Sequence, residues 1–413
     1  IEGASSGTNE DTQAFGAGLS AIAAAVVIRD TEFEDNVAQG GHTVSADGGC
    51  GAGGGMALRG TPAGTLLEDV ELTGNRALGG VGPERGGLAI GGAIFTYNAQ
   101  VTGRDLILTG NMAIAGDSTG SGFADNEWAD AQGGAIAFQI GTTADFSSIL
   151  VSQNQALGGD AGGSGGGAFG GGIYAELADL VTLTDLEVRQ NLSRAGSGTD
   201  GGIGAGGGIY AGQSRVEVER AVVIGNSAVG GDGNGGAQGS AGGGGVYFAK
   251  YTDGTPLTTL SNSIVAENEA TLGAGSVVGG GGAGLFVIGN DAYVSHCTFA
   301  GNVLNSTPMG GLAMSFVNHQ LGTSGTVEHT IVAGHTSAGG GVPAVKVQSD
   351  SYLTMDRLLF AGNDLDTNED APDAGTFIER GGRLEVTDAG FVSPGQPASD
   401  YHITADSPAV DAG

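Results

Sequence analysis

Four aspartates recur six residues ahead of a repeated asparagine and form the most ordered polar column in the sequence: Asp30, Asp69, Asp105 and Asp185. Carboxylates stacked about 5 Å apart repel one another. A calcium ion between them would relieve that repulsion, because calcium favours several oxygen ligands. The competing interpretation, which we favour, is that each aspartate caps a turn by accepting hydrogen bonds from backbone amides. Calcium is thus the one cofactor that the sequence suggests, with these four residues as its candidate ligands.

The same column carries histidines in two adjacent repeats, at His296 and His329. Two stacked imidazoles could share a metal ion. However, the pattern places no third acid or thiol beside them. We therefore expect these histidines to face solvent or to bond to a turn.

The elements that must position this column come from an internal repeat, in which an apolar residue is followed by two mostly small or polar residues and then by asparagine. There are ten copies, spaced 28 to 43 residues apart, and His335 replaces the asparagine in one of them. A repeat of this length is typical of solenoids. The repeated asparagines are Asn36, Asn75, Asn111, Asn154, Asn191, Asn226, Asn268, Asn302 and Asn363.

A second motif, two glycines followed by a small and an apolar residue, lies between consecutive copies, as at 91–94 and 133–136. Each period then holds about three short β-branched bursts and no helical pattern, which favours strands. We predict an all-β, right-handed parallel β-helix of about 10–11 coils. Residues 1–28 would form an N-terminal cap or first coil, 29–371 the repeats, and 372–413 the last coil and a C-terminal cap.

In the predicted coil, each position of the repeat lies in a turn, points into the core or lies on the outside. Asparagine suits the turn because its short amide tolerates left-handed backbone and can bond to the asparagines of neighbouring coils. The residues three and five before it should both point inward, since side chains alternate along a strand. Glycine-rich segments such as 155–169 and 227–242 should stack on one side as a flange, and lateral loops of solenoids are often the binding face.

The amino-acid composition and net charge limit the kinds of partner that this chain could bind. The 413 residues include 85 glycines and carry a net charge of −31, with Lys250 and Lys346 as the only lysines. Nucleic acid and anionic lipid would be repelled by this charge. The longest apolar run, 21–28, is too short to span a membrane, so we expect no direct membrane insertion. The start at Ile1 suggests that a leader was removed or that the chain is part of a longer polypeptide.

The two cysteines, Cys50 and Cys297, lie six to seven repeats apart. At about 4.8 Å per coil that separation is roughly 30 Å. A disulfide needs Cα atoms within about 7 Å. We therefore predict two free thiols, with Cys297 buried.

Two motifs carry a family resemblance. Phe33–Asn36 and Phe360–Asn363, together with Gly-Gly-Ala-Ile at 91–94 and 133–136, resemble the repeats of polymorphic outer-membrane proteins. That resemblance, over roughly residues 30–365, implies a β-helical surface domain acting in adhesion. The closing segment, 400–413, is similar to that of choice-of-anchor bacterial surface proteins, which implies a bacterial extracellular or cell-surface location.

Catalysis on such a fold would mean polysaccharide cleavage. A hydrolase needs two carboxylates about 5 to 9 Å apart, and a lyase needs a basic residue to take a proton. Acid pairs such as Glu68 and Asp69, or Asp366 with Glu369, are not singled out by the pattern. We therefore assign no catalytic residues and no further cofactor.

We expect a non-catalytic surface or matrix protein, an adhesin or a filament subunit, that associates with itself or with a cell-surface or carbohydrate ligand. The alternative is a carbohydrate-active enzyme or carbohydrate-binding β-helix.

Overall fold

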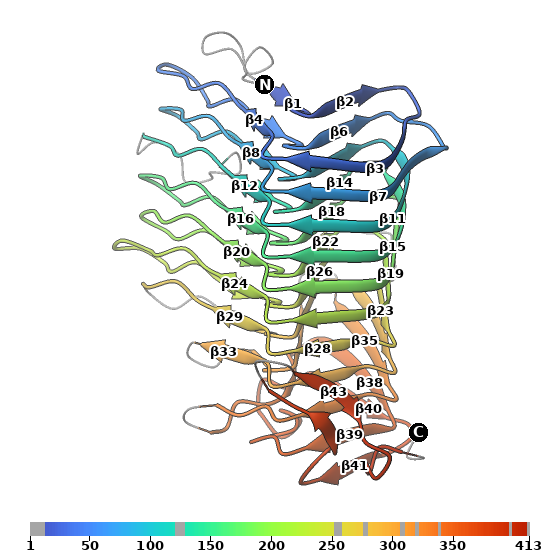
Figure 1. Cartoon of the computed structure of the whole chain (residues 1–413). Helices are drawn as coiled ribbons and strands as arrows, with labels where there is room; N and C mark the ends of the chain where they lie inside the picture. The colour runs from blue at the N-terminus through green and yellow to red at the C-terminus, as the bar shows by residue number, and fades with distance from the viewer. Residues whose placement is uncertain are drawn as a thin grey trace.

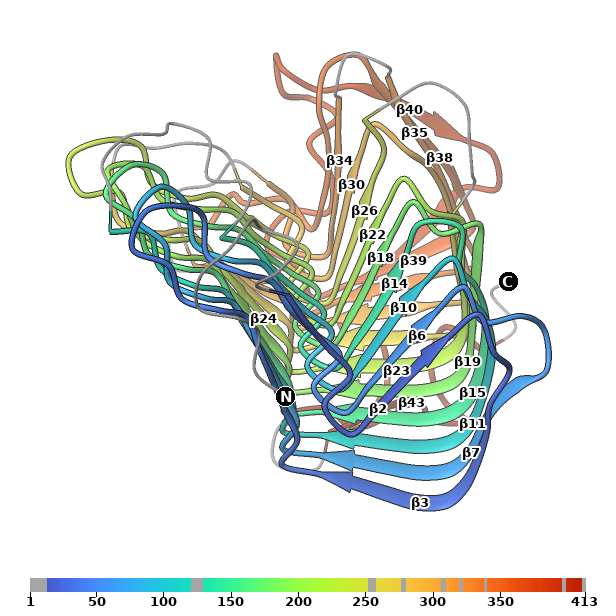
Figure 2. The same cartoon turned by 90° about the horizontal axis from the view of Figure 1, so that it is seen from above.

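The computed structural model describes residues 13–119, 129–251, 258–275, 280–305, 310–318, 322–337, 340–395 and 399–410. Within these ranges the regular secondary structure consists of β-strands alone, and the chain winds into a parallel β-helix (Figure 1). Viewed from the N-terminal end, the chain turns clockwise as it recedes from the viewer, so the winding is right-handed (Figure 2). The predicted fold class is therefore confirmed.

Two large parallel sheets enclose the core (Figures 1 and 2). We call the first the flat sheet: β2 (Leu19–Ile22), β6 (Met56–Arg59), β10 (Ile94–Tyr97), β14 (Ile136–Gln139), β18 (Ile173–Glu176), β22 (Ile209–Gly212), β26 (Val246–Ala249), β30 (Leu285–Ile288), β34 (Met314–Val317) and β37 (Val345–Val347). The second, which turns a corner within each coil, is the bent sheet: β3 (Val27–Glu34), β7 (Thr65–Thr73), β11 (Gln100–Thr109), β15 (Thr143–Ser152), β19 (Leu180–Arg189), β23 (Val216–Ile224), β27 (Thr258–Ser261), β28 (Ile264–Ala266), β31 (Asp291–Ser295), β32 (Thr298–Ala300), β35 (Thr323–Glu328), β36 (Ile331–Ala333), β38 (Ser351–Asp356), β39 (Leu358–Ala361), β40 (Thr376–Glu379) and β41 (Arg383–Val386).

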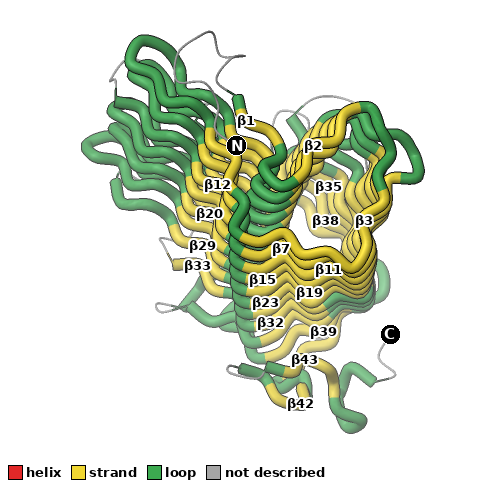
Figure 3. Tube along the Cα trace, turned by 45° about the horizontal axis from the view of Figure 1, so that its top comes forward, coloured by secondary structure: helices red, strands yellow, loops and turns green. Residues whose placement is uncertain are grey.

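Two narrow sheets form a flange on one side of the coils (Figures 2 and 3). The outgoing flange sheet contains β4 (Val37–Gln39), β8 (Arg76–Leu78), β12 (Met112–Ile114), β16 (Gln155–Leu157), β20 (Leu192–Arg194), β24 (Ser227–Val229), β29 (Glu269–Thr271) and β33 (Val303–Asn305). The returning flange sheet contains β1 (Ala14–Phe15), β5 (Gly51–Ala52), β9 (Ala89–Ile90), β13 (Ala131–Gln132), β17 (Ala168–Phe169), β21 (Gly204–Ala205) and β25 (Ala241–Gly242). Coils that carry the flange therefore hold four strands rather than three. The flange strands escape the sequence pattern because they are only two or three residues long, and most of them contain alanine in place of a large apolar residue.

The core lies inside the coils as one continuous column of apolar side chains. Equivalent residues stack in register, as in the pairing of Ile209 with Val246 and of Leu186 with Ala221. The positions three and five before the asparagine are buried in every copy from the second onward, whereas Thr31 and Phe33 in the first copy are half-buried. Burying a valine, leucine, isoleucine or phenylalanine side chain at these positions stabilises the fold by about 1.5–3 kcal/mol.

The asparagines form a continuous ladder beside this core. The Nδ2 atom of Asn75 donates to Oδ1 of Asn111 at 3.0 Å and to the carbonyl oxygen of Phe33 at 2.8 Å. The backbone amide of Asn75 donates to the same Asn111 oxygen at 2.9 Å. Each buried amide side chain is thus satisfied by the coils on both sides, which a buried polar group requires. The pattern repeats from Asn36 to Asn302.

The flange is held together by backbone rather than by side chains. The amide of Gly166 donates to the carbonyl of Gly159, Gly196 to Gly166, Gly202 to Gly196, and Gly231 to Gly202, at 2.8 to 3.0 Å. These bonds cross between the outgoing and returning limbs of successive coils. A Cβ atom on Gly196 would overlap the backbone of Gly159 in the outgoing limb of the preceding coil, so the close stacking of successive coils in the flange requires glycine.

Both ends of the chain contribute to the coils. Ala14 pairs with Gly51 and Leu19 with Met56, so the first described residues already belong to the first coil. At the other end β40 and β41 form the last rung of the bent sheet. The hairpin of β42 (Phe391–Ser393) and β43 (Asp400–Ile403) then returns along the outside of the bent sheet (Figure 1), where the Tyr401 hydroxyl donates to Glu267 at 2.8 Å.

Both cysteines are free thiols, as predicted. Cys297 is 2% exposed, and its sulfur lies 3.2 Å from the Ser295 carbonyl oxygen. Burial raises the pKa of its thiol to about 12.

Candidate functional site

The column that contains the four candidate aspartates is the corner of the bent sheet. All ten of its residues have positive φ, between 46° and 57°: Asp30, Asp69, Asp105, Ser148, Asp185, Arg220, Asn262, His296, His329 and Arg357. Aspartate, asparagine and histidine are the non-glycine residues that most readily adopt this left-handed conformation. The backbone bend therefore accounts for most of the polar character of the column and leaves each side chain on the outside.

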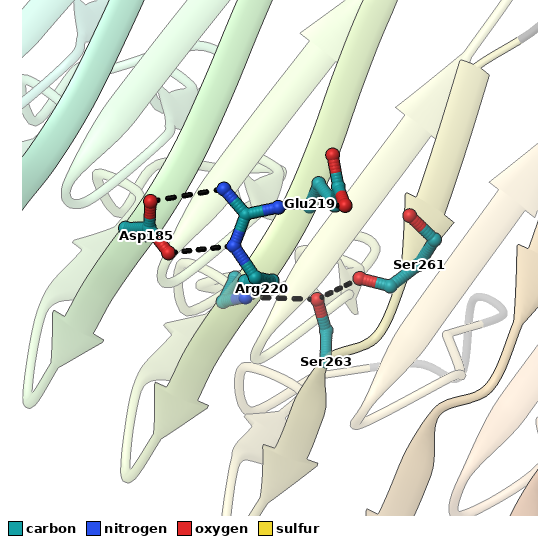
Figure 4. Close-up of polar contacts among 6 residues, drawn as sticks. Asp185, Glu219, Arg220, Ser261 and Ser263 are labelled. Carbon is teal, nitrogen blue, oxygen red and sulfur yellow. Dashed lines mark hydrogen bonds and ion pairs between the residues drawn. The ribbon is translucent and has the colours of Figure 1, made fainter.

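The four aspartates do not share one environment. Asp185 makes a bidentate ion pair with Arg220 on the next rung, at 2.7 and 2.9 Å (Figure 4), and this guanidinium lowers the pKa of the Asp185 carboxyl. Asp30, Asp69 and Asp105 lie exposed on three consecutive rungs, where Arg29 pairs with the neighbouring Glu68. Across the described ranges, no group of three or more histidine, cysteine, aspartate or glutamate side chains could hold a metal ion.

His296 and His329 do lie together, as their spacing predicts. Their imidazole rings are stacked, with centroids 4.7 Å apart and an interplanar angle of 11°. With Asn262 and Arg357 they line one wall of a cavity of about 1000 Å³ beneath the C-terminal hairpin. The cavity could not be predicted from the repeat, because its other wall comes from residues 401–403 and 409, which belong to the irregular C-terminal segment.

A second site occupies the corner between the flat sheet and the flange. Tyr174, Tyr210 and Tyr247 stack on successive rungs with ring centroids 5.2 and 5.4 Å apart, and Phe286 continues the stack at 4.9 Å. All four rings are less than 10% exposed. They form an outer core that fixes the flange to the flat sheet, and their faces are covered by one another.

Glu176 stands at the edge of this outer core, on β18 beside the tyrosines. Burial raises the pKa of its carboxyl to about 7. The same desolvation, with Glu176 and Tyr251 nearby, raises the pKa of Tyr210. Sequence reasoning missed Glu176 because it is a single acid in its column. The one available signal was a tyrosine after the Gly-Gly-Gly motif in three successive repeats.

The remaining acids named in the sequence have structural partners. The carboxylate of Glu68 pairs with Arg29, and that of Glu369 with Arg383 at 2.7 Å. Asp366 accepts a hydrogen bond from Asn363 Nδ2 at 2.9 Å. None of these pairs of acids lies in the cavity beneath the hairpin. Among the residues with a described structure, no helix is long and apolar enough to cross a membrane.

No protein family model matches this chain, and neither a curated protein nor a solved structure matches it. The resemblance to polymorphic outer-membrane repeats and to choice-of-anchor proteins therefore remains a prediction. The site must be interpreted from its own residues.

Proposed function

We propose that this chain is a non-catalytic bacterial protein of the cell surface or extracellular matrix, an adhesin or a subunit of a larger surface structure, and that the flange is its contact surface. The observation that carries the proposal is the flange itself. Coil after coil extends a glycine-rich excursion in the same direction, and these excursions stack into one plate (Figures 2 and 3). A structure repeated on one side of a solenoid is often its binding face.

The rigidity of the flange supports this role. Its two backbone layers hydrogen-bond to each other and to the coils above and below. Alanines such as Ala113, Ala131 and Ala156 fill the space between the layers at its base. Because the plate is ordered before any partner arrives, little conformational entropy is lost on binding.

The outer loops of the flange present exposed side chains at different heights along the molecule. Val44, in the first coil, is 96% exposed. Glu84, Thr199 and Asn234 are exposed in the loops of later coils. Single exposed apolar side chains are ordinary on protein surfaces, so these four residues are of interest for their position on the outer loops, where a partner would meet the flange first.

An attachment assay tests the proposal. Beads coated with the full chain are mixed with cells or matrix of the native source, alongside beads with Val44→Lys, Glu84→Lys and Asn234→Lys combined. Controls carry Glu71→Lys and Ile107→Lys, which alter outward-facing positions of the bent sheet. We expect the flange variant to lose attachment and the control to keep it. Equal attachment by both variants would contradict the flange as the contact surface.

The second candidate function is a carbohydrate-active protein, and Glu176 is the acid through which it can be tested. A carboxyl whose pKa lies near 7 can act as a general acid at neutral pH. Incubation with pectate, alginate, xylan and chondroitin sulfate, followed by a reducing-end assay, tests it. New reducing ends that disappear in Glu176→Gln would support the enzyme, and no release by either protein would leave the non-catalytic proposal standing.

A further inference from the structure

The cavity beneath the C-terminal hairpin is built by two parts of the chain that are distant in sequence. One wall is the corner column of the bent sheet, from Asn262 to Arg357, and the other is the returning segment with Tyr401 and His402. The hairpin is fixed in place by the Tyr401 hydroxyl on Glu267 and by the perpendicular packing of Phe391 on Tyr401, at 5.2 Å between centroids. The cavity is therefore a formed site rather than a gap between loosely held segments.

The hairpin packs through two small apolar clusters at the edges of the cavity. Tyr401 packs with Ile224, Ala266 and Ala300. Ala389 packs with Leu359 and its neighbours on the last coils. Between these anchors the cavity remains open, with a volume of about 1000 Å³. That volume is at the upper end of the range of small-molecule sites.

The lining gathers side chains that carry N–H groups, although the protein as a whole is strongly acidic. The chain has 45 aspartates and glutamates against 14 lysines and arginines. Even so, the cavity is lined by Arg357, Arg383 and three of the six histidines, and by no carboxylate. Carboxylates outside the lining pair with Arg357, with Arg383 and with His402. A site that is lined by N–H groups and by no carboxylate can offer hydrogen bonds to an anion.

Two of these groups have capacity for a ligand. The His329 ring lines the cavity and stacks on His296, and its Nδ1 atom is buried without a hydrogen-bond partner. Because Nδ1 is shielded from solvent, a ligand in the cavity would contact this imidazole through Nε2. The guanidinium of Arg357 bonds to Asp356 through Nε at 3.1 Å and through Nη2 at 3.4 Å. Because guanidinium carries five N–H donors, Nη1 remains available for a second anion.

One strip of the lining is apolar. Ile331, Leu359 and Leu384 occupy one outward-facing column of the bent sheet on successive rungs. Ile403 from the hairpin lines the same cavity. A ligand held at its charged end by His329 and Arg357 would place the remainder of its body against these side chains.

We propose that this cavity binds a small amphipathic anion, with a carboxylate or similar oxyanion at His329 and Arg357 and an apolar body along Ile331, Leu359 and Leu384. Arginine forks match the geometry of oxyanions, and such charge-assisted hydrogen bonds are among the strongest in proteins. The site is separate from the flange and does not depend on the function proposed for it.

Isothermal titration calorimetry of the full chain tests the proposal with three probes: octanoate, its uncharged counterpart 1-octanol, and acetate, which lacks the apolar body. We expect saturable binding of one octanoate per chain. The other two probes should bind at least about tenfold more weakly, since each lacks one half of the recognition. Equal binding of octanol, equal binding of acetate, or no saturable octanoate binding would each overturn the proposal.

Variants in the corner column localise the site. His329→Asn keeps a residue that tolerates positive φ, and Arg357→Gln removes the guanidinium; each should weaken octanoate binding about tenfold or more. The matched control is Arg220→Gln, which removes a cation from the same column outside the cavity. Circular dichroism melting curves check that each variant is folded. Folded His329 and Arg357 variants that bind octanoate like the parent chain would place the ligand elsewhere and refute the assignment.

Discussion

The Nδ1 atom of His335 lies 3.1 Å from the Oδ1 atom of Asn363, and this contact continues the asparagine ladder through the one repeat that lacks asparagine. On the other side, Asn302 Nδ2 lies 3.2 Å from His335 Nε2. Asn302 and Asn363 each donate from Nδ2 to a backbone carbonyl, which fixes the orientation of both amides. The imidazole must therefore be neutral, with its proton on Nδ1 and an acceptor at Nε2.

This geometry predicts an acid-sensitive ladder. Burial lowers the pKa of His335 from 6.5 to about 4. Between these two values the unfolded chain binds more protons than the folded chain, so stability falls as the pH drops from 6.5 towards 4. The loss at pH 4 is of order 3 kcal/mol. His335→Asn should remove this loss, measured as the free energy of unfolding in urea at pH 5 and pH 8.

The control for that experiment is His402→Asn, because His402 is an exposed histidine whose side chain is 75% accessible. We expect it to leave the pH dependence unchanged. If His335→Asn and the parent chain lose stability equally on acidification, the neutral ladder histidine is not the cause.

Glu176 predicts the opposite dependence of folding stability on pH. Burial raises the pKa of its carboxyl from 4.5 to about 7, so the folded chain binds more protons between these values and stability falls as the pH rises through them. Glu176→Gln should therefore be more stable than the parent chain at pH 8, by up to about 3 kcal/mol, and should differ little at pH 4. Urea unfolding at both pH values decides this, and a parent-like pH profile for the variant would contradict a buried carboxyl.

The tight packing of the flange predicts that replacing one of its buried glycines by alanine destabilises the protein. Gly196→Ala would place a Cβ atom on the backbone of Gly159, which cannot move without breaking the hydrogen bonds between layers. We expect a loss of about 2 kcal/mol or more in the free energy of unfolding. Gly110→Asn is the matched control: Gly110 has φ of 65° with nothing within 4 Å of an added Cβ, and asparagine tolerates that conformation. Similar stability of the two variants would show that successive coils of the flange can move apart to accept a side chain.

Calcium gives a direct test of the aspartate column. Because positive φ accounts for Asp30, Asp69 and Asp105 without a metal, we expect the melting temperature to be the same in calcium and in a chelator. A calcium-dependent rise of several degrees that Asp69→Asn abolishes would restore the metal interpretation.

The sequence predicts the coil well because every coil requires the same kinds of residue at the same positions. Leu72 and Val70 point inward, Asn75 fills the turn, and the ten polar residues of the corner occupy one conformation. Tyr247 shows the limit of this reasoning. Its neighbours Val246 and Phe248 lie in the main core, but Tyr247 faces outward and is buried by the flange instead. Periodicity alone cannot reveal a second buried face.

The cavity was beyond prediction for a different reason. The contact between Tyr401 and Glu267 joins residues 134 positions apart. Glu267 belongs to the recurring motif, directly before Asn268, but Tyr401 does not. The corner histidines could be placed on adjacent rungs from their spacing. The hairpin that covers these histidines could not be predicted, because the path of a single non-repeated segment leaves no pattern in the sequence.

Immunogold electron microscopy of the native source, with an antibody raised against the purified chain, tests the central claim most directly. The account predicts gold label on the cell surface, along filaments, or in the surrounding matrix. Label confined to the cell interior, or a protein recovered only as free monomer in the medium, would contradict a surface or matrix role.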